Sequence, residues 1–233
     1  MNATQTAAGT FCWSCNASTA GGHFCAACGK IQPLPRDADY FQFFGLPRKL
    51  RIDSGALEAK FHQLSWKLHP DNFVRAGEAE RQLSLERSSQ LNDAYRVLRD
   101  PVACVEYLLG LEGMRKEGAA KQQAPPELLE EVFELNESLD ELRGARQSAD
   151  REEINSLRPR LQEAQKTFEG KLREVDADLA SAAKDWDAAV DRGTNGDASA
   201  AERGKLLSRM NEILNRRSYI RNLVSSVEKE LAE

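Results

Sequence analysis

The chain has 233 residues, of which 30% are charged and 7% aromatic, and its formal net charge at pH 7 is −5. This composition favours helical, elongated modules, and an acidic balance without any basic stretch argues against a nucleic-acid binder. No apolar run approaches the ~20 residues that span a membrane, so no membrane partner is expected.

The N-terminal segment, residues 1–36, lacks the features of a targeting sequence. It contains no Lys or Arg before Lys30, whereas secretion signals and mitochondrial transit peptides carry basic residues. We therefore expect a cytoplasmic protein, or a protein of the mitochondrial matrix if a presequence has been removed.

Four of the five cysteines lie in the same segment, in two Cys-x-x-Cys pairs separated by nine residues: Cys12 with Cys15, and Cys25 with Cys28. Each tight turn offers two thiolates, and two such turns complete the tetrahedral four-sulfur site that structural zinc prefers. A segment this short has no hydrophobic core of its own, so metal ligation would have to supply its folding free energy. The spacing predicts a tetracysteine metal-binding module over residues 1–36, with one structural zinc ion as cofactor.

Other roles for this segment stay open at the level of sequence. Iron binds the same four ligands, and a homodimer formed through the module would leave the same pattern. A redox Cys-x-x-Cys is less favoured because the strand–helix–strand context is missing. His23 is interpreted as a surface histidine of the loop, since four sulfurs already close the site, and Cys104 as a small buried residue.

The region 37–112 contains two helical patterns joined by His69-Pro70-Asp71. The first pattern, residues 53–68, places four apolar side chains on one face: Leu57, Phe61, Leu64 and Leu68. Pro70 is excluded from a helix interior and biases His69 away from helical backbone angles. The tripeptide is therefore predicted to be the exposed turn between two antiparallel helices, with Asp71 also in position to cap the second helix.

This hairpin resembles the J-domain, the module through which J-proteins stimulate the ATPase of an Hsp70 chaperone. The resemblance rests on the tripeptide and on the segment from Asn92-Asp93-Ala94-Tyr95 to Asp100-Pro101 that closes the second helix. In J-domains the tripeptide forms an exposed tip that contacts Hsp70, and the preceding helix offers positive charge. The resemblance implies these Hsp70-binding residues: His69, Pro70, Asp71, Lys60 and Lys67. Without it, they would be a surface histidine, a helix cap and two solvated lysines.

Residues 113–126 are polar and end in Ala124-Pro125-Pro126, which predicts a linker before a helix start. Residues 127–233 then carry three long helical patterns. Pro159 either kinks the second pattern or marks its start, and residues 193–196, with a glycine at each end, separate it from the third.

Apolar side chains recur in these three patterns at spacings of three, four and seven residues, which predicts a bundle of three helices. The first pattern contains Leu128, Val132, Leu135, Leu139 and Leu142; the second Ile154, Leu157, Leu161, Ala164, Phe168, Val175, Leu179, Ala182 and Trp186; the third Leu206, Met210, Ile213, Ile220, Val224, Val227 and Leu231. The expected fold class is mainly α: a small N-terminal zinc knuckle, a J-domain helical hairpin and a C-terminal three-helix bundle.

Three further segments resemble the HscB family, whose J-proteins serve iron–sulfur cluster biogenesis: Asp39 to Pro47, Glu106 to Leu109, and the acidic stretch Glu131 to Glu141. The paired N-terminal cysteines match the longer form of that family. The resemblance implies a co-chaperone that binds an IscU-type scaffold protein through its C-terminal bundle. It would deliver the scaffold to an Hsp70 of the HscA or DnaK type and activate that Hsp70's ATPase, promoting cluster transfer.

Two other classes of function are weighed against this one. A general J-protein that holds unfolded clients is the alternative, but its Gly/Phe-rich linker and β-sandwich client domain are missing from the sequence. The chain itself is not expected to be an enzyme, because it has no phosphate-binding glycine loop and no catalytic constellation.

The resemblance also implies a set of scaffold-contact residues: Leu129, Phe133, Glu134, Glu137, Glu141 and Tyr219. The pattern offers a physical reason, because Leu129 and Phe133 lie beside the core stripe of the first pattern and continue toward the glutamates. Apolar anchors flanked by acids form a reasonable surface for a basic partner. The plainer interpretation is that Leu129 and Phe133 widen the core stripe and that the glutamates form a solvated face.

Overall fold

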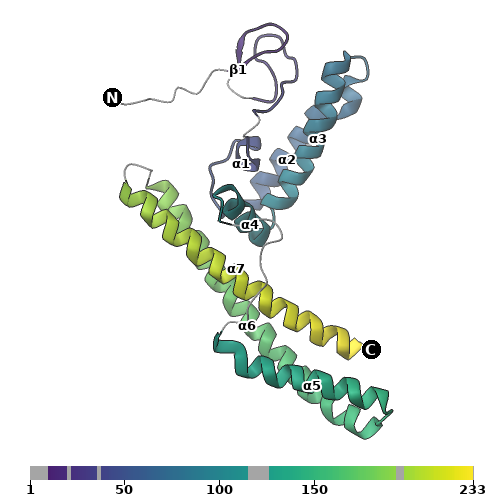
Figure 1. Cartoon of the computed structure of the whole chain (residues 1–233). Helices are drawn as coiled ribbons and strands as arrows, with labels where there is room; N and C mark the ends of the chain where they lie inside the picture. Colours follow the sequence, from purple (N-terminus) through teal and green to yellow (C-terminus); the bar gives the residue numbers. More distant parts are fainter. Residues whose placement is uncertain (1–9, 20–21, 36–37, 115–125, 193–196, 233) are drawn as a thin grey trace. The chain divides into compact units, whose positions relative to one another are not determined.

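The computed structural model (Figure 1) describes these residues: 10–19, 22–35, 38–114, 126–192 and 197–232. They belong to two compact units, Met1–Cys104 and Val105–Glu233, which are described separately. Most of the segment predicted as a linker, and the predicted break at residues 193–196, lie outside the described residues. Among the described helices, none combines the length and the apolar character needed to cross a membrane.

The N-terminal module contains little regular structure. Two short antiparallel strands, β1 (Thr10–Phe11) and β2 (Ser18–Thr19), bracket the first cysteine pair. An isolated bridge between Phe24 and Ile31 brackets the second pair. Among the residues of this module that the structure describes, Ile31 is fully buried and the other buried apolar residues are cysteines. The module is therefore a pair of knuckles, as predicted, rather than a domain with its own hydrophobic core.

The rest of the first unit is built on two antiparallel helices, α2 (Ser54–Leu68) and α3 (Glu78–Leu98), joined by the short 3₁₀ helix η1 (Pro70–Phe73). We call α2, η1 and α3 the hairpin. Pro70 occupies the first position of η1, where its missing N–H has no intrahelical acceptor to lose. The predicted hairpin is thus confirmed. A one-turn helix, α1 (Tyr40–Phe43), precedes it and packs on α3.

The predicted apolar stripe of α2 faces the inside of the hairpin. Leu57, Leu64 and Leu68 are buried, and Phe61 is half-buried with its ring stacked on that of Tyr95, 4.1 Å between centroids. Other buried apolar side chains of this unit are Phe41, Phe43, Phe44, Leu50, Phe73, Leu91, Ala94, Leu98 and Cys104. Helix α4 (Pro101–Leu111) follows α3 directly, capped by Asp100, which accepts hydrogen bonds from two backbone N–H groups.

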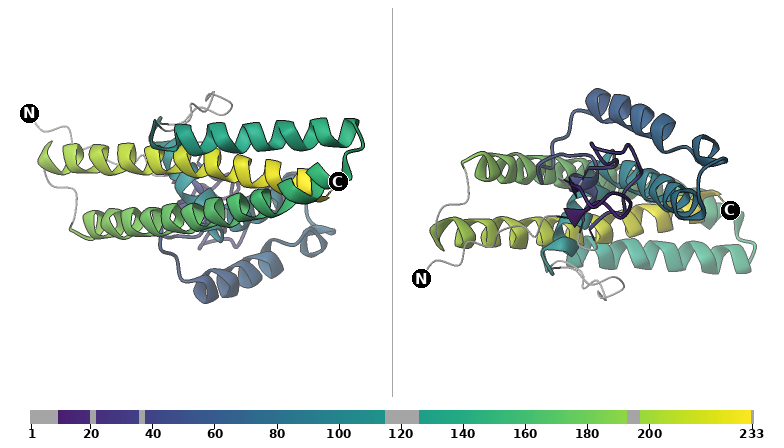
Figure 2. Two further views of the ribbon diagram at one scale, coloured as in Figure 1. Left: turned by 90° about the horizontal axis from the view of Figure 1, so that it is seen from below. Right: turned by 90° about the horizontal axis from the view of Figure 1, so that it is seen from above.

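The second unit is the predicted three-helix bundle (Figures 1 and 2). A 3₁₀ turn, η2 (Pro126–Leu128), leads into α5 (Leu129–Gln147), which is followed by α6 (Arg151–Asp191) and α7 (Asp197–Ala232). Helices α6 and α7 form a long antiparallel pair, and α5 lies along the half of that pair made by the start of α6 and the end of α7. The core joins all three helices, and its members are Leu128, Val132, Leu135, Leu139, Leu142, Leu157, Leu161, Phe168, Val175, Ile220, Val224 and Val227.

Two details of the long helices differ from the expectation. Helix α6 begins at Arg151, capped by Asp150, so Pro159 lies inside the helix and does not mark its start. In α7, Leu207 is buried and the predicted Leu206 is half-buried. A helix of 3.6 residues per turn drifts against a regular repeat of seven, so the contact face of a long helix moves by a residue along its length.

A buried carboxylate ties the ends of α5 and α7 together. Glu230 of α7 is 7% exposed and accepts hydrogen bonds from Arg143 at 2.7 Å and from Arg146 at 2.8 Å, both on α5. Burying a carboxylate destabilises a fold unless the charge is paired and hydrogen-bonded. The two arginines supply that pairing and set the register of the shorter helix on the longer one.

Candidate functional site

The tip between α2 and α3, residues 69–71, is exposed and internally ordered. The side chains of His69 and Asp71 are 55% and 84% exposed. His69 ends α2 and caps η1, because its Nδ1 accepts the backbone N–H of Asp71 at 3.2 Å. The predicted cap at Asp71 is therefore wrong: the imidazole of His69 caps η1, α3 has Gly77 at its N-cap without a side-chain cap, and the Asp71 carboxylate stays available to solvent.

The base of the tip is braced from both sides. From α3, the hydroxyls of Ser84 and Ser88 donate to the carbonyl oxygen of Leu68, at 2.7 and 2.9 Å. From the turn itself, the amide of Asn72 donates to the carbonyl oxygen of Trp66 at 2.6 Å. These bonds satisfy carbonyls that a helix C-terminus otherwise leaves without partners. These hydrogen bonds hold the backbone on both sides of the tip in place.

The face of α2 next to the tip carries one feature that the apolar periodicity does not indicate. Trp66 is 76% exposed, although tryptophan has a large apolar surface to bury. Lys67 beside it is exposed and Lys60 is half-buried. The signal was present in the sequence, since position 66 falls outside the stripe of Leu57, Leu64 and Leu68, yet carries a large aromatic residue.

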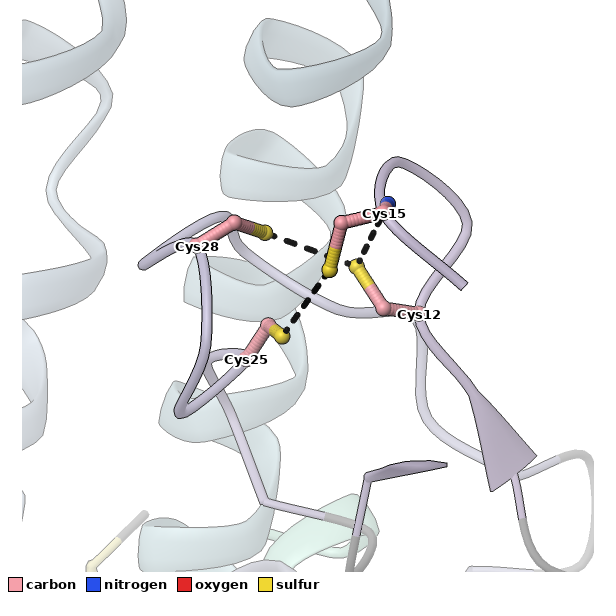
Figure 3. A group of neighbouring side chains, drawn as sticks. All are labelled: Cys12, Cys15, Cys25 and Cys28. Atoms are coloured by element: carbon pink, nitrogen blue, oxygen red, sulfur yellow. Dashed lines mark hydrogen bonds between the residues drawn. The ribbon is translucent and has the colours of Figure 1, made fainter. Parts of the chain in front are cut away.

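The four cysteines of the N-terminal module converge on one point (Figure 3). All four sulfurs lie within 4.8 Å of one another, and Cys12 pairs with Cys28 at 3.6 Å and Cys15 with Cys25 at 3.7 Å. A tetrahedral zinc site with Zn–S bonds of about 2.3 Å places its sulfurs roughly 3.8 Å apart. The separations between the knuckles therefore fit a single four-sulfur metal ion.

The local electrostatics favour ionised sulfur at one of these ligands. Burial opposes ionisation of the Cys12 thiol, but hydrogen bonds from the backbone N–H groups of Cys15 and Ser14, together with those from the Cys28 and Cys15 thiols, outweigh it and lower its pKa to about 6. The contacts among the four thiols raise the pKa of Cys28, so the negative charge is placed on Cys12. The side chain of Gln32 also donates to Cys12 Sγ, at 3.3 Å. Because the thiolate is the form that binds metal, these donors prepare the site for a cation.

His23 is not the surface histidine that was expected. Its ring is half-buried, with Nε2 2.9 Å from the carbonyl oxygen of Phe43 and Nδ1 2.7 Å from the guanidinium of Arg87. Burial and the charge of Arg87 lower its pKa to about 4. Both ring nitrogens are engaged in the first unit, so His23 does not compete for the metal. The sequence could not show this, because Arg87 lies 64 residues away.

On the second unit, the face predicted to contact a scaffold is exposed. Leu129 is 54% exposed and Phe133 is 71% exposed, one turn apart on α5. Residues that widened the core stripe would be buried, so the plainer interpretation does not fit these two side chains. The face is an unpartnered apolar surface on this unit.

The predicted acidic residues follow this apolar pair along α5. Glu134, Glu137 and Glu141 are exposed on α5, and Glu141 lies 3.7 Å from Arg160 of α6. Glu134 also lines a groove of about 210 Å³ between α5 and α6. Tyr219 of α7 is half-buried and packs against the bundle core, so only part of its ring is accessible.

Comparison with known proteins places both units in one family. The family profile described as "HSCB C-terminal oligomerisation domain" matches residues 124–192. A co-chaperone protein HscB homolog of Azoarcus sp. is 37% identical over 147 residues, which cover 63% of this chain and 77% of that protein. An iron-sulfur cluster co-chaperone protein HscB homolog of Arabidopsis thaliana is 34% identical over 160 residues, or 69% of this chain and 60% of that protein.

Other relatives agree over shorter or more divergent stretches. A co-chaperone protein HscB homolog of Vibrio parahaemolyticus is 38% identical over 104 residues, 45% of this chain, and the match spans only 61% of that protein's length. The crystal structure of human co-chaperone protein HscB superposes with a TM-score of 0.59, covering 95% of this chain and 98% of that one at 23% identity, which shows a shared fold. The chain belongs to the HscB family of co-chaperones.

Proposed function

We propose that the chain is an adaptor between two proteins of iron–sulfur cluster biogenesis. It binds an IscU-type scaffold through α5 and delivers it to an Hsp70 of the HscA or DnaK type, whose ATPase it activates. The observation that carries the proposal is the exposed and braced tip at His69 to Asp71, in a chain that belongs to the HscB family. The proposed domains are the metal module (1–36), the J-domain (37–112), a linker (113–126) and the scaffold-binding bundle (127–233).

The tip acts by binding and not by chemistry. Pro70 fixes the turn, while the imidazole of His69 and the carboxylate of Asp71 face solvent, where a partner reaches both. Lys60 and Lys67 add positive charge on α2. Because the tip is ordered in advance, little of its binding free energy is lost to ordering. A partner can be shifted toward hydrolysis only if the tip binds its hydrolysis-competent conformation more tightly than the other.

The scaffold-binding face combines exposed apolar side chains, which anchor a partner, with carboxylates that attract a basic partner electrostatically. Leu129 and Phe133 offer apolar surface that is already exposed, and Glu134, Glu137 and Glu141 extend from it along α5 with negative charge. Anchors of this kind carry most of the affinity of an interface, while the charges raise the association rate and select a basic partner. Tyr219 contributes the accessible part of its ring from α7.

The metal module is proposed to hold one structural zinc ion through Cys12, Cys15, Cys25 and Cys28. The convergence of four sulfurs and the scarcity of other buried apolar side chains support a structural role for the ion. When bound, zinc supplies folding free energy to the knuckles. The chain is proposed to act in the cytoplasm, or in the mitochondrial matrix if a presequence has been removed.

The proposal is tested by calorimetric titration of the full chain with an IscU-type scaffold and, separately, with ATP-bound Hsp70. We expect one site for each partner, and a preformed complex with scaffold that still binds Hsp70. A chain that binds only one of the two, or that binds them in competition, would contradict the adaptor role.

Trp66→Ala should weaken the docking of Hsp70 without disabling the tip. The side chain is 76% exposed, so its removal leaves no cavity, while its carbonyl oxygen still holds Asn72. The Hsp70 concentration for half-maximal stimulation should rise about tenfold, a loss of ~1.4 kcal/mol in binding, with the maximal rate kept. Leu85→Ala on α3 is the matched control, because Leu85 is also exposed, at 55%. Equal effects of the two substitutions would show that Trp66 has no specific role in the Hsp70 interface.

A further inference from the structure

Arg87 is a buried arginine of α3 that the proposed function does not use. Its residue is 1% exposed, and burial lowers its pKa to about 10, so the guanidinium remains charged at neutral pH. A buried charge destabilises a fold unless it is hydrogen-bonded. Within the part of the chain that the structure describes, Nε and Nη1 of Arg87 have no hydrogen-bond partner. The contact made by its remaining nitrogen therefore matters for the stability of α3.

That contact comes from the metal module. Nη2 of Arg87 lies 2.7 Å from Nδ1 of His23. An arginine only donates hydrogen bonds, so Nδ1 accepts, and the ring proton resides on Nε2, which donates to the carbonyl oxygen of Phe43 at 2.9 Å. The Phe43 ring also lies against the guanidinium, 5.1 Å from its central carbon to the ring centroid. The module thus supplies the acceptor for a charge buried in α3.

A second contact joins the module to the same face of α3. Lys30 Nζ lies 2.5 Å from Oε2 of Glu80, a residue that is 8% exposed. Glu80 and Arg87 are seven residues apart, so they lie two turns apart on one side of the helix. The module therefore supplies a partner for two opposite charges of α3: His23 accepts a hydrogen bond from Arg87, and Lys30 forms an ion pair with Glu80.

Both module residues are held by the second cysteine knuckle. His23 precedes Cys25 by two residues, and Lys30 follows Cys28 by two. Backbone hydrogen bonds from Cys25 to Lys30 and from Gln32 to His23, both 2.9 Å, close the loop between them. Since the knuckle has so little else to hold its shape, ligation of its two sulfurs fixes the positions of both contacts.

We infer that metal binding by the tetracysteine module stabilises the α2–α3 hairpin, with Arg87 and Glu80 as the residues that couple the two. Loss of the metal releases His23 and Lys30, and Arg87 then has no acceptor among its described neighbours. Coupling between two sites is reciprocal in free energy, so loss of the contacts on α3 weakens metal binding by the same factor. The inference holds whichever Hsp70 or scaffold the chain binds.

The coupling extends toward the tip because one helix serves both. Ser84, which donates to the carbonyl oxygen of Leu68, lies between Glu80 and Arg87 on the buried face of α3. Ser88, one turn beyond Ser84, donates to the same oxygen. A metal-loaded module therefore steadies the helix that braces the Hsp70-binding tip.

The first test measures Zn²⁺ affinity in the full chain by competition with a chromophoric chelator. Arg87→Met and Glu80→Gln alter α3 and leave all four sulfurs in place. Each should lower Zn²⁺ affinity at least about fivefold, the lower end of typical coupling between sites. Arg81→Met is the control on the same helix, because its guanidinium is exposed and pairs with Glu78 on α3 itself. The control should keep the wild-type affinity.

The second test measures amide hydrogen exchange over Glu78–Leu98 with Zn²⁺ bound and after chelation. Exchange in α3 should speed up without metal, while α6 and α7 of the second unit provide an internal reference that does not change. Arg87→Met should reduce the dependence of α3 exchange on metal, because only the contact between Lys30 and Glu80 then joins the module to α3. If Arg87→Met does not fold, the Zn²⁺ affinity and the α3 exchange of Glu80→Gln test the inference instead. The inference is overturned by wild-type Zn²⁺ affinity in the folded variants, by α3 exchange that ignores the metal, or by a wild-type chain that binds no Zn²⁺.

Discussion

Replacing His69 by Gln is expected to abolish stimulation of the Hsp70 ATPase. Two roles of the imidazole are lost together: its Nδ1 caps η1 by accepting the N–H of Asp71, and its ring forms part of the exposed tip. A glutamine side chain is longer, more flexible and lacks the planar ring, so the turn is no longer held in one conformation. Single-turnover hydrolysis by the Hsp70 with the variant should fall to the rate without any co-chaperone.

A matched histidine on the same helix serves as control. His62→Gln changes an exposed imidazole of α2 that lies 3.8 Å from Glu58 and outside the tip, and it should retain most of the stimulation. Scaffold binding by His69→Gln should equal that of the wild type, because the scaffold face belongs to another unit. The adaptor role requires the two binding functions to be independent. A fall in scaffold affinity would show that they are not.

Replacing Phe133 by Ala is expected to weaken the scaffold complex by ~2 kcal/mol or more, about 30-fold in Kd. Phe133 is 71% exposed, so the substitution removes an anchor without opening a cavity in the bundle. The free energy of unfolding should change by no more than about 0.5 kcal/mol. Calorimetric titration with scaffold and denaturant unfolding of the free protein measure the two quantities.

Glu137→Ala should reduce mainly the association rate, since an exposed carboxylate steers more than it anchors. The effect should shrink as salt is added. Glu163→Ala removes one negative charge at an exposed site of α6 and controls for net charge alone. If Phe133→Ala binds scaffold as tightly as the wild type, the exposed apolar pair of α5 has another purpose and the scaffold site lies elsewhere.

Much of the fold could be predicted from local pattern. Periodicity located the helices, because side chains such as Leu57 and Leu64 have to share one face to be buried. Pro70 forced the break between α2 and α3 through its backbone geometry. The Cys-x-x-Cys spacing predicted the convergence of four sulfurs, because each tight turn places its two thiols close together and two such turns form a four-sulfur site.

Periodicity could not decide how far a side chain beside the stripe is exposed. Position 133 lies only one residue from Val132, which is buried, yet Phe133 is exposed. Neighbouring positions on a helix point about 100° apart, and the packing of α6 and α7 against α5 decides which of the two is covered. The pattern alone therefore favours a wider core, and only the family resemblance favours the binding face.

Contacts between residues far apart in sequence could not be predicted from the sequence alone. Arg87 finds His23, 64 residues earlier, and Glu230 finds Arg143, 87 residues earlier. Each is a charged group whose burial depends on a partner from another element. A single sequence shows the charge and not the partner, so a buried arginine resembles a solvated one until the fold is known.

The measurement that tests the central claim most directly is single-turnover ATP hydrolysis by an HscA- or DnaK-type Hsp70, with this chain and with or without an IscU-type scaffold. If the chain is an adaptor, it should stimulate hydrolysis by itself and stimulate it further when scaffold is added. That increase should disappear with Phe133→Ala, while stimulation by the chain alone remains. Stimulation that is indifferent to the scaffold, or no stimulation at all, would contradict the adaptor role.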